Sequence, residues 1–114
     1  MMQDRSVRTS VRAARTWLGP HLYDVPDSLR ARMRAALSGE NHGERSVSRA
    51  LLSAALGSLD QALALGNARS AAAPLLAADA LLTVACEAAA EEDDTGPFAE
   101  AACAALARRL DGNA

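Results

Sequence analysis

The sequence predicts an all-α protein, and its composition alone leads to that fold class. Half of the 114 residues are apolar, yet only three are aromatic, and alanine is the commonest residue. Isoleucine and lysine are absent, and the other β-branched residues are scarce. Because alanine and leucine favour helices whereas β-branched residues favour strands, strands are disfavoured along the whole chain. We therefore expect one compact bundle of about five short helices, a single domain over residues 1–114 with a flexible tail at 111–114.

The first helix is expected from about residue 4 to residue 18, where Gly19-Pro20 should end it. Its apolar residues recur at intervals of four, three and four, which places them on one helical face: Val7, Val11, Ala14 and Leu18. Its arginines form a basic edge about 100° around the helix from that face: Arg5, Arg8, Arg12 and Arg15.

A second helix is expected to begin at Asp24 or Asp27, since either residue can cap it. Met33 and Leu37 belong to its apolar face, together with Leu29 and Ala36. The run of helix-breaking residues at 38–43 should end it near Leu37, and this loop is the only hinge that the sequence suggests.

The third and fourth helices are expected to form an antiparallel hairpin at the centre of the bundle. The third helix covers about residues 46–65, and its leucines share one face: Leu52, Leu56, Leu59 and Leu63. Gly66-Asn67 should end it, and such a short loop makes the next helix its antiparallel neighbour. That fourth helix is expected over about residues 70–92, with Pro74 in or near its first turn.

The fifth helix should follow the acidic run at residues 91–94, with Pro97 in its first turn. Its expected apolar face consists of Phe98, Ala102, Ala105, Leu106 and Leu110. We interpret the acidic run as a solvated helix end and turn; carboxylates for a divalent cation are the alternative.

The fourth helix is apolar around most of its circumference, which is typical of a helix buried on several sides. It is therefore either the central helix of the bundle or part of an oligomer interface. In the second case five residues would lie in a homodimer interface: Leu75, Leu81, Leu82, Val84 and Cys86.

One polar line interrupts the apolar surface of the fourth helix: Asp79, Thr83 and Glu87. We expect this line to face water or an arginine, because an unpaired buried carboxylate is costly. One alternative is that these polar groups line a ligand pocket near Asp79 and Trp17. Another is that they are buried and fix the register of the packed helices.

No catalytic residue, metal site or cofactor is predicted. His21 and His42 are expected in solvated loops, and no pair of His, Cys or acidic residues has metal-ligand spacing. No activated nucleophile and no phosphate-binding loop is recognisable. Cys86 and Cys103 are interpreted as small core residues of a cytoplasmic protein. Since no uninterrupted apolar stretch is long enough to span a bilayer, we expect no membrane contact.

The charge is unevenly distributed between the two halves of the chain. Residues 1–50 carry nine arginines and five acidic residues, a net +4, whereas residues 51–114 carry three arginines and nine acidic residues, a net −6. This asymmetry favours contact between the halves, within one chain or between chains. Contact of the basic edge with nucleic acid is the less favoured explanation, because the chain is acidic overall and lacks a nucleic-acid-binding motif.

Two short stretches resemble segments of known families. Residues 75–87 are similar to a helix of the all-α polyprenyl diphosphate synthases, but the two DDxxD-type motifs that hold magnesium diphosphate in those enzymes are absent. Residues 25–33 look like helix starts in bacterial anti-sigma factors, without the zinc-binding His/Cys spacing found in many of them. Neither resemblance transfers an active-site residue to this chain.

The sequence therefore suggests a non-enzymatic helical bundle that acts through protein–protein contact or self-association, with a homodimer as the expected assembly. A binding protein for a small apolar ligand, of lipid or prenyl type, is the first alternative. A transcription-related regulator that contacts nucleic acid or a sigma-like partner is the second.

Overall fold

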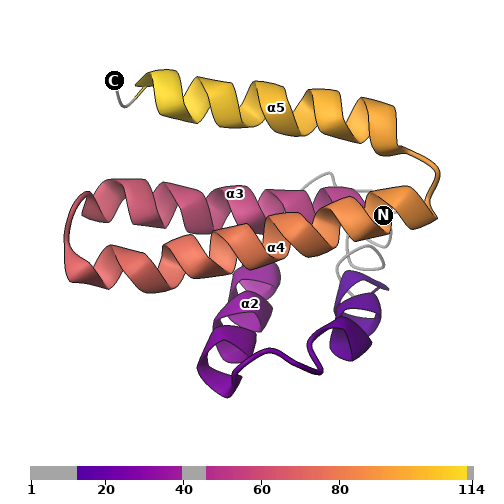
Figure 1. Cartoon of the computed structure of the whole chain (residues 1–114), viewed down its shortest axis with the longest axis horizontal. Coiled ribbons are helices and arrows are strands. Elements are labelled where there is room, and N and C mark those ends of the chain that lie inside the picture. Colours follow the sequence, from indigo (N-terminus) through magenta and orange to yellow (C-terminus); the bar gives the residue numbers. More distant parts are fainter. Residues whose placement is uncertain (1–12, 40–45, 113–114) are drawn as a thin grey trace, which may run out of the picture.

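The structure is a computed structural model that describes residues 13–39 and 46–112. Within these ranges the chain is helical and contains no strand, which confirms the all-α fold class (Figure 1). The elements are a helical segment at residues 13–21, α2 (Asp27–Gly39), α3 (Val47–Leu65), the short 3₁₀ helix η1 (Arg69–Ala71), α4 (Ala72–Glu91) and α5 (Thr95–Gly112).

The antiparallel pair of α3 and α4 forms the centre of the molecule, as expected. Much of the surface that these two helices bury is alanine. Seven alanines of the pair are at most 3% exposed: Ala50, Ala54, Ala55, Ala77, Ala85, Ala88 and Ala89. Small side chains let two helix axes approach to the short end of the usual 8–10 Å range. The pair can therefore pack closely over about five helical turns.

Local signals fix the ends of the two central helices. Ser46, in an extended conformation, accepts a hydrogen bond from the backbone N–H of Arg49 and so caps α3. Gly66 ends α3 with a φ of 61°, a conformation that glycine adopts without steric cost, and its N–H bonds to carbonyls of the last turn. Pro74 is fully buried in the first turn of α4, where its missing N–H breaks no bond of the helix.

The turn between α4 and α5 is a Schellman motif, which keeps the connection short. The N–H of Asp94 bonds to the carbonyl of Ala89 at 2.9 Å, and that of Asp93 bonds to the carbonyl of Ala90 at 3.2 Å. Asp93 takes the left-handed position with a φ of 56°, where glycine is the usual residue. The chain thus reverses within three residues, and α5 returns along α4.

The remaining helices cover the two faces of the central pair. Figure 1 shows α2 and the segment 13–21 on one face and α5 on the opposite face. The first face is closed by large apolar side chains that are at most 1% exposed: Leu18, Leu22, Met33 and Leu37. The apolar face expected for the second helix is therefore confirmed at Met33 and Leu37.

Several predicted boundaries differ from the structure. The first helix continues through Gly19-Pro20 to residue 21, because a proline in the last turn removes only one hydrogen bond. The second helix ends at Gly39 rather than near Leu37. The fifth helix includes Asp111 and Gly112, which were expected in the flexible tail. Val7, Val11 and the hinge residues 40–43 lie outside the described residues.

Both cysteines are exposed, so their expected place in the core is wrong. The alanines on the other side of α4 and α5 make the buried contacts instead, and Cys86 and Cys103 are turned outward. Leu110 also leaves the predicted apolar face of the fifth helix, since it is 58% exposed.

The stretch Arg69–Glu91, which includes α4, is long and apolar enough to cross a bilayer by length and composition alone. Core helices of proteins without membrane spans share this property. In this fold eight residues of α4 are buried against other parts of the chain, among them Ala77, Leu81 and Ala85.

Close packing of the central pair predicts that an enlarged side chain at its buried face destabilises the protein. Ala85 is completely buried, so Ala85→Leu should lower the free energy of unfolding by about 1–3 kcal/mol through overpacking. Urea denaturation followed by circular dichroism measures this change. Ala90→Leu is the matched control, because Ala90 lies on the same helix but is exposed and should change stability by less than about 0.5 kcal/mol. Equal effects of the two substitutions would contradict close packing at Ala85.

Candidate functional site

An apolar groove of about 180 Å³ lies where α5 crosses the central pair. Its wall consists of seven apolar residues and one carboxylate: Ala55, Leu56, Leu59, Leu75, Ala78, Leu82, Leu106 and Asp79. The groove remains because α5 buries mainly small residues against the pair. Ala102 and Ala105 are 6% and 5% exposed, and Phe98 is the only large side chain of α5 that is fully covered.

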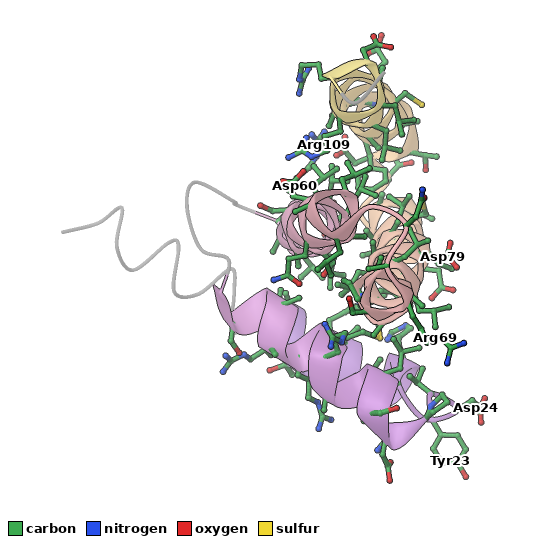
Figure 2. The ribbon with its side chains drawn as sticks, turned by 90° about the vertical axis from the view of Figure 1, so that its left-hand side faces the viewer. Tyr23, Asp24, Asp60, Arg69, Asp79 and Arg109 are labelled. Atoms are coloured by element: carbon green, nitrogen blue, oxygen red, sulfur yellow. The ribbon has the colours of Figure 1, made fainter. Side chains whose placement is uncertain are left out.

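Ionic contacts close one side of α5 over α3 and leave the other side open. Arg109 donates to Asp60 from Nε at 2.9 Å and from Nη2 at 3.4 Å, a two-point contact between α5 and α3. Figure 2 shows this pair between α5 and α3, and Asp79 on the outer side of α4, pointing away from the bundle. The groove therefore has its one carboxylate at its α4 edge, away from the Arg109–Asp60 pair.

Exposed residues extend the groove along α4 and α5. Leu75 is 52% exposed at its edge, and Cys86 follows Leu82 by one helical turn. On α5, Cys103 and Leu110 lie one turn before and one turn after Leu106. We call these six residues the α4–α5 stripe: Leu75, Leu82, Cys86, Cys103, Leu106 and Leu110.

The five residues predicted for a homodimer interface fall on two different faces of α4. Leu75, Leu82 and Cys86 belong to the α4–α5 stripe and are exposed or half-buried. Leu81 is 0% exposed and Val84 is 8% exposed, both covered by the chain itself. The bundle thus covers Leu81 and Val84 without a second copy, and only the first three residues are placed to meet a partner.

The polar line of α4 faces solvent. Asp79, Thr83 and Glu87 are all exposed, and the Thr83 hydroxyl donates to the backbone carbonyl of Asp79 at 2.9 Å. Asp79 borders the groove, whereas the segment 13–21, to which Trp17 belongs, lies on the opposite face of the central pair from α5 (Figure 1). The groove beside Asp79 is not lined by Trp17, and its volume is below the few hundred Å³ that a pocket for a whole drug-sized ligand would have.

Trp17 instead connects the helical segment 13–21 to the C-terminal end of α4. Its indole N–H donates to Oε2 of Glu91 at 2.5 Å, and its ring stacks on His21 with centroids 3.6 Å apart. Nδ1 of His21 is 2.8 Å from the backbone carbonyl of Trp17. His21, expected in a solvated loop, is exposed as expected, but it lies at the end of the helical segment 13–21 and stacks on Trp17.

The acidic run that follows α4 holds the helices together at this end of the molecule. The Glu92 carboxylate accepts hydrogen bonds from the hydroxyl of Ser48 at 2.5 Å and from its backbone N–H at 3.2 Å, so it caps α3 from the end of α4. Asp94 pairs with Arg49 at 3.6 Å, and the Arg49 guanidinium lies 5.8 Å from the centre of the Phe98 ring. The expectation of a merely solvated turn missed these contacts, because their partners lie more than 40 residues away in the chain.

The arginine edge of the first helix lies mostly outside the described residues. Arg5, Arg8 and Arg12 belong to that part of the chain, and Arg15 donates to the hydroxyl of Ser38 on α2. Among residues 13–39 and 46–112, no group of three or more His, Cys, Asp or Glu side chains lies close enough together to hold a metal ion.

No protein-family model matches the chain, and neither the curated proteins nor the solved structures give a significant match.

The cap that Glu92 provides predicts a loss of stability when its carboxylate is removed. Glu92→Ala removes the acceptor of the Ser48 backbone N–H and leaves the buried Ser48 hydroxyl only its 3.2 Å contact with the Ser46 hydroxyl, which should cost about 1–3 kcal/mol. Thermal and urea denaturation of the variant measure this loss. Glu87→Ala is the control, since Glu87 is an exposed carboxylate on the same helix and should change stability by less than about 0.5 kcal/mol. A Glu92 variant as stable as the control would rule out the cap.

Proposed function

We propose that this chain is a non-enzymatic helical bundle that acts through protein–protein contact, with self-association into a homodimer as its assembly. The observation that carries the proposal is the α4–α5 stripe. Its Leu75, which lines the groove, is 52% exposed, and its Leu110, one helical turn after the groove residue Leu106, is 58% exposed. Contiguous exposed apolar surface of this kind is typical of interaction sites.

The proposal also rests on the contrast between Leu75 and Leu110 and the large apolar residues that the bundle buries; Tyr23, Leu65 and Leu76 are exposed as well. Leu18, Leu22, Met33, Leu37, Leu51 and Leu81 are all less than 2% exposed, so the bundle does bury such side chains where helices cover them. Leu75 and Leu110 remain about half exposed to water. Full burial of a leucine side chain stabilises a protein by about 1.5–3 kcal/mol relative to an exposed one. A partner that covers the stripe would recover part of this free energy.

Self-association is tested by the solution mass of the purified chain, measured by size-exclusion chromatography with light scattering. We expect twice the 11.8 kDa of one chain at micromolar concentration. Leu75→Ser together with Leu110→Ser should raise the dimer dissociation constant about tenfold or more, because the apolar contact is lost.

Leu76→Ser is the matched control for this experiment, since Leu76 is 59% exposed on α4 but borders neither the groove nor the stripe. It should leave the mass unchanged. Leu81→Asp would not serve, because Leu81 is fully buried and its replacement would unfold the bundle. A monomer at every concentration would overturn the homodimer.

A second candidate function is the binding of a small apolar ligand in the groove. Its wall of leucine and alanine favours this function, and Asp79 at its edge favours a neutral or cationic head group over a carboxylate. The groove of about 180 Å³ can hold only part of a prenyl or acyl chain, and the rest would lie along the stripe.

Leucine methyl groups report such binding, whereas Trp17 on the opposite face does not. Titration with farnesol should shift the methyl resonances of Leu59, Leu82 and Leu106 if the groove binds a prenyl chain. The methyl groups of Leu22 and Leu37 should not move, because these residues are buried under α2 and the segment 13–21. Shifts spread evenly over both sets, or no shifts at all, would exclude the groove as a ligand site.

A further inference from the structure

We infer that the α4–α5 stripe is the docking site for the basic residues 1–12 of a second copy of this chain, exchanged between the two copies of the dimer. The inference rests on the proposed self-association and names the segments that meet. Its first support is the net charge of the two helices that carry the stripe. Residues 72–112, which form α4, α5 and their turn, contain eight acidic residues and two arginines, a net −6.

The acidic groups nearest to the stripe are exposed. Asp79 stands between Leu75 and Leu82 on α4 and borders the groove. Glu100 lies one helical turn before Cys103 on α5 and is also exposed. By contrast, Asp60 and Asp94 on the closed side are paired with Arg109 and Arg49. The stripe therefore presents apolar side chains beside two carboxylates that are open to an incoming cation.

This charge argues against direct contact between the stripes of two copies. Stripe against stripe would place the Asp79 and Glu100 carboxylates of both copies in one interface without a basic partner, and like charges in one interface oppose association. A two-fold dimer can avoid this repulsion when the stripe of each copy receives a different, basic part of its partner.

Residues 1–12 have the chemistry that the stripe requires. They contain Arg5, Arg8 and Arg12 with Asp4 as the only acidic residue, and Val7 and Val11 share one face by their spacing of four. The helix expected from residue 4 would contribute nine residues to this segment, about 14 Å at 1.5 Å per residue, which fits within the span from Leu75 to Cys86 on α4.

Residues 1–12 are followed by the helical segment 13–21, which packs against the central pair of its own copy. Ala14 and Leu18 are at most 1% exposed, and Trp17 is bonded to Glu91 on the face of the central pair that lies away from α5. The described chain begins at residue 13, on the face of the central pair that lies away from α5. A segment that precedes residue 13 would have to pass around the central pair to reach the stripe of its own copy, and the stripe of a second copy requires no such path.

A charge exchange tests the inference with the full-length chain. Arg5→Glu, Arg8→Glu and Arg12→Glu together should weaken the dimer about tenfold or more, measured by sedimentation or light scattering. Asp79→Arg with Glu100→Arg should weaken it as well. Combining both sets in one chain should restore the wild-type dissociation constant to within about threefold, because the pairing is re-formed with reversed signs.

Two controls separate this pairing from a general effect of charge. Arg69→Glu and Glu87→Arg alter exposed residues away from the stripe and should leave the dissociation constant unchanged. A synthetic peptide of residues 1–12 should bind a variant that lacks this segment, and Leu75→Ser should weaken this binding whereas Leu76→Ser should not. Circular dichroism of each variant checks that the bundle remains folded.

The outcomes distinguish this inference from the proposed function. A dimer that persists without residues 1–12 but dissociates in the Leu75 and Leu110 variant would keep self-association and overturn the exchange of the basic segment. If the wild-type chain is monomeric and its stripe still binds the peptide, residues 1–12 contact the stripe of their own copy, and the dimer is overturned. Failure of the combined charge reversal to restore association would overturn the pairing of residues 1–12 with the stripe.

Discussion

The close packing of α3 against α4 is the contact on which the rest of this structure depends. Both helices bury mainly alanine, and seven of these alanines are at most 3% exposed. Two helices that approach so closely form one flat layer, and the other helices can cover it only from its two faces. On one face α2 and the segment 13–21 supply the large side chains that the layer lacks, such as Met33 and Leu37. On the other face α5 supplies Phe98 at its start and mostly alanine after it, so the packing is incomplete there.

The two ends of the α4–α5 hairpin differ for a related reason. At the turn, three neighbouring carboxylates each bind a different part of the chain: Glu91 binds Trp17, Glu92 binds Ser48 and Asp94 binds Arg49. These contacts join the first segment, α3 and α5 at one place. At the far end the ion pair of Arg109 and Asp60 holds only one side of α5. The groove and the exposed leucines lie towards this second end, where the fold has fewer cross-links.

The proposed functions make competing use of the same surface. A prenyl or acyl chain and a segment of a second copy would both cover Leu75, Leu82 and Leu106, so binding of one should exclude the other. The uneven charge of the chain favours the second copy, because a basic segment can neutralise Asp79 and Glu100 while its apolar face covers the leucines. Neither use needs a nucleophile, a metal or a cofactor.

The sequence by itself determined the fold class, the existence of the helices and several of their ends. Ser46, Gly66 and Pro74 act within one turn of their own position, so their effect can be read locally. The buried face of α4 could not be predicted in the same way, because leucine and alanine residues of α4 occupy most of its circumference and their periodicity selects no single face. Only the tertiary structure decided that Leu81 is buried, that Leu75 and Cys86 are exposed, and that Glu92 caps a helix 44 residues away in the chain. Those outcomes depend on which helices lie on which side of the central pair, and that arrangement is set by long-range packing rather than by local sequence.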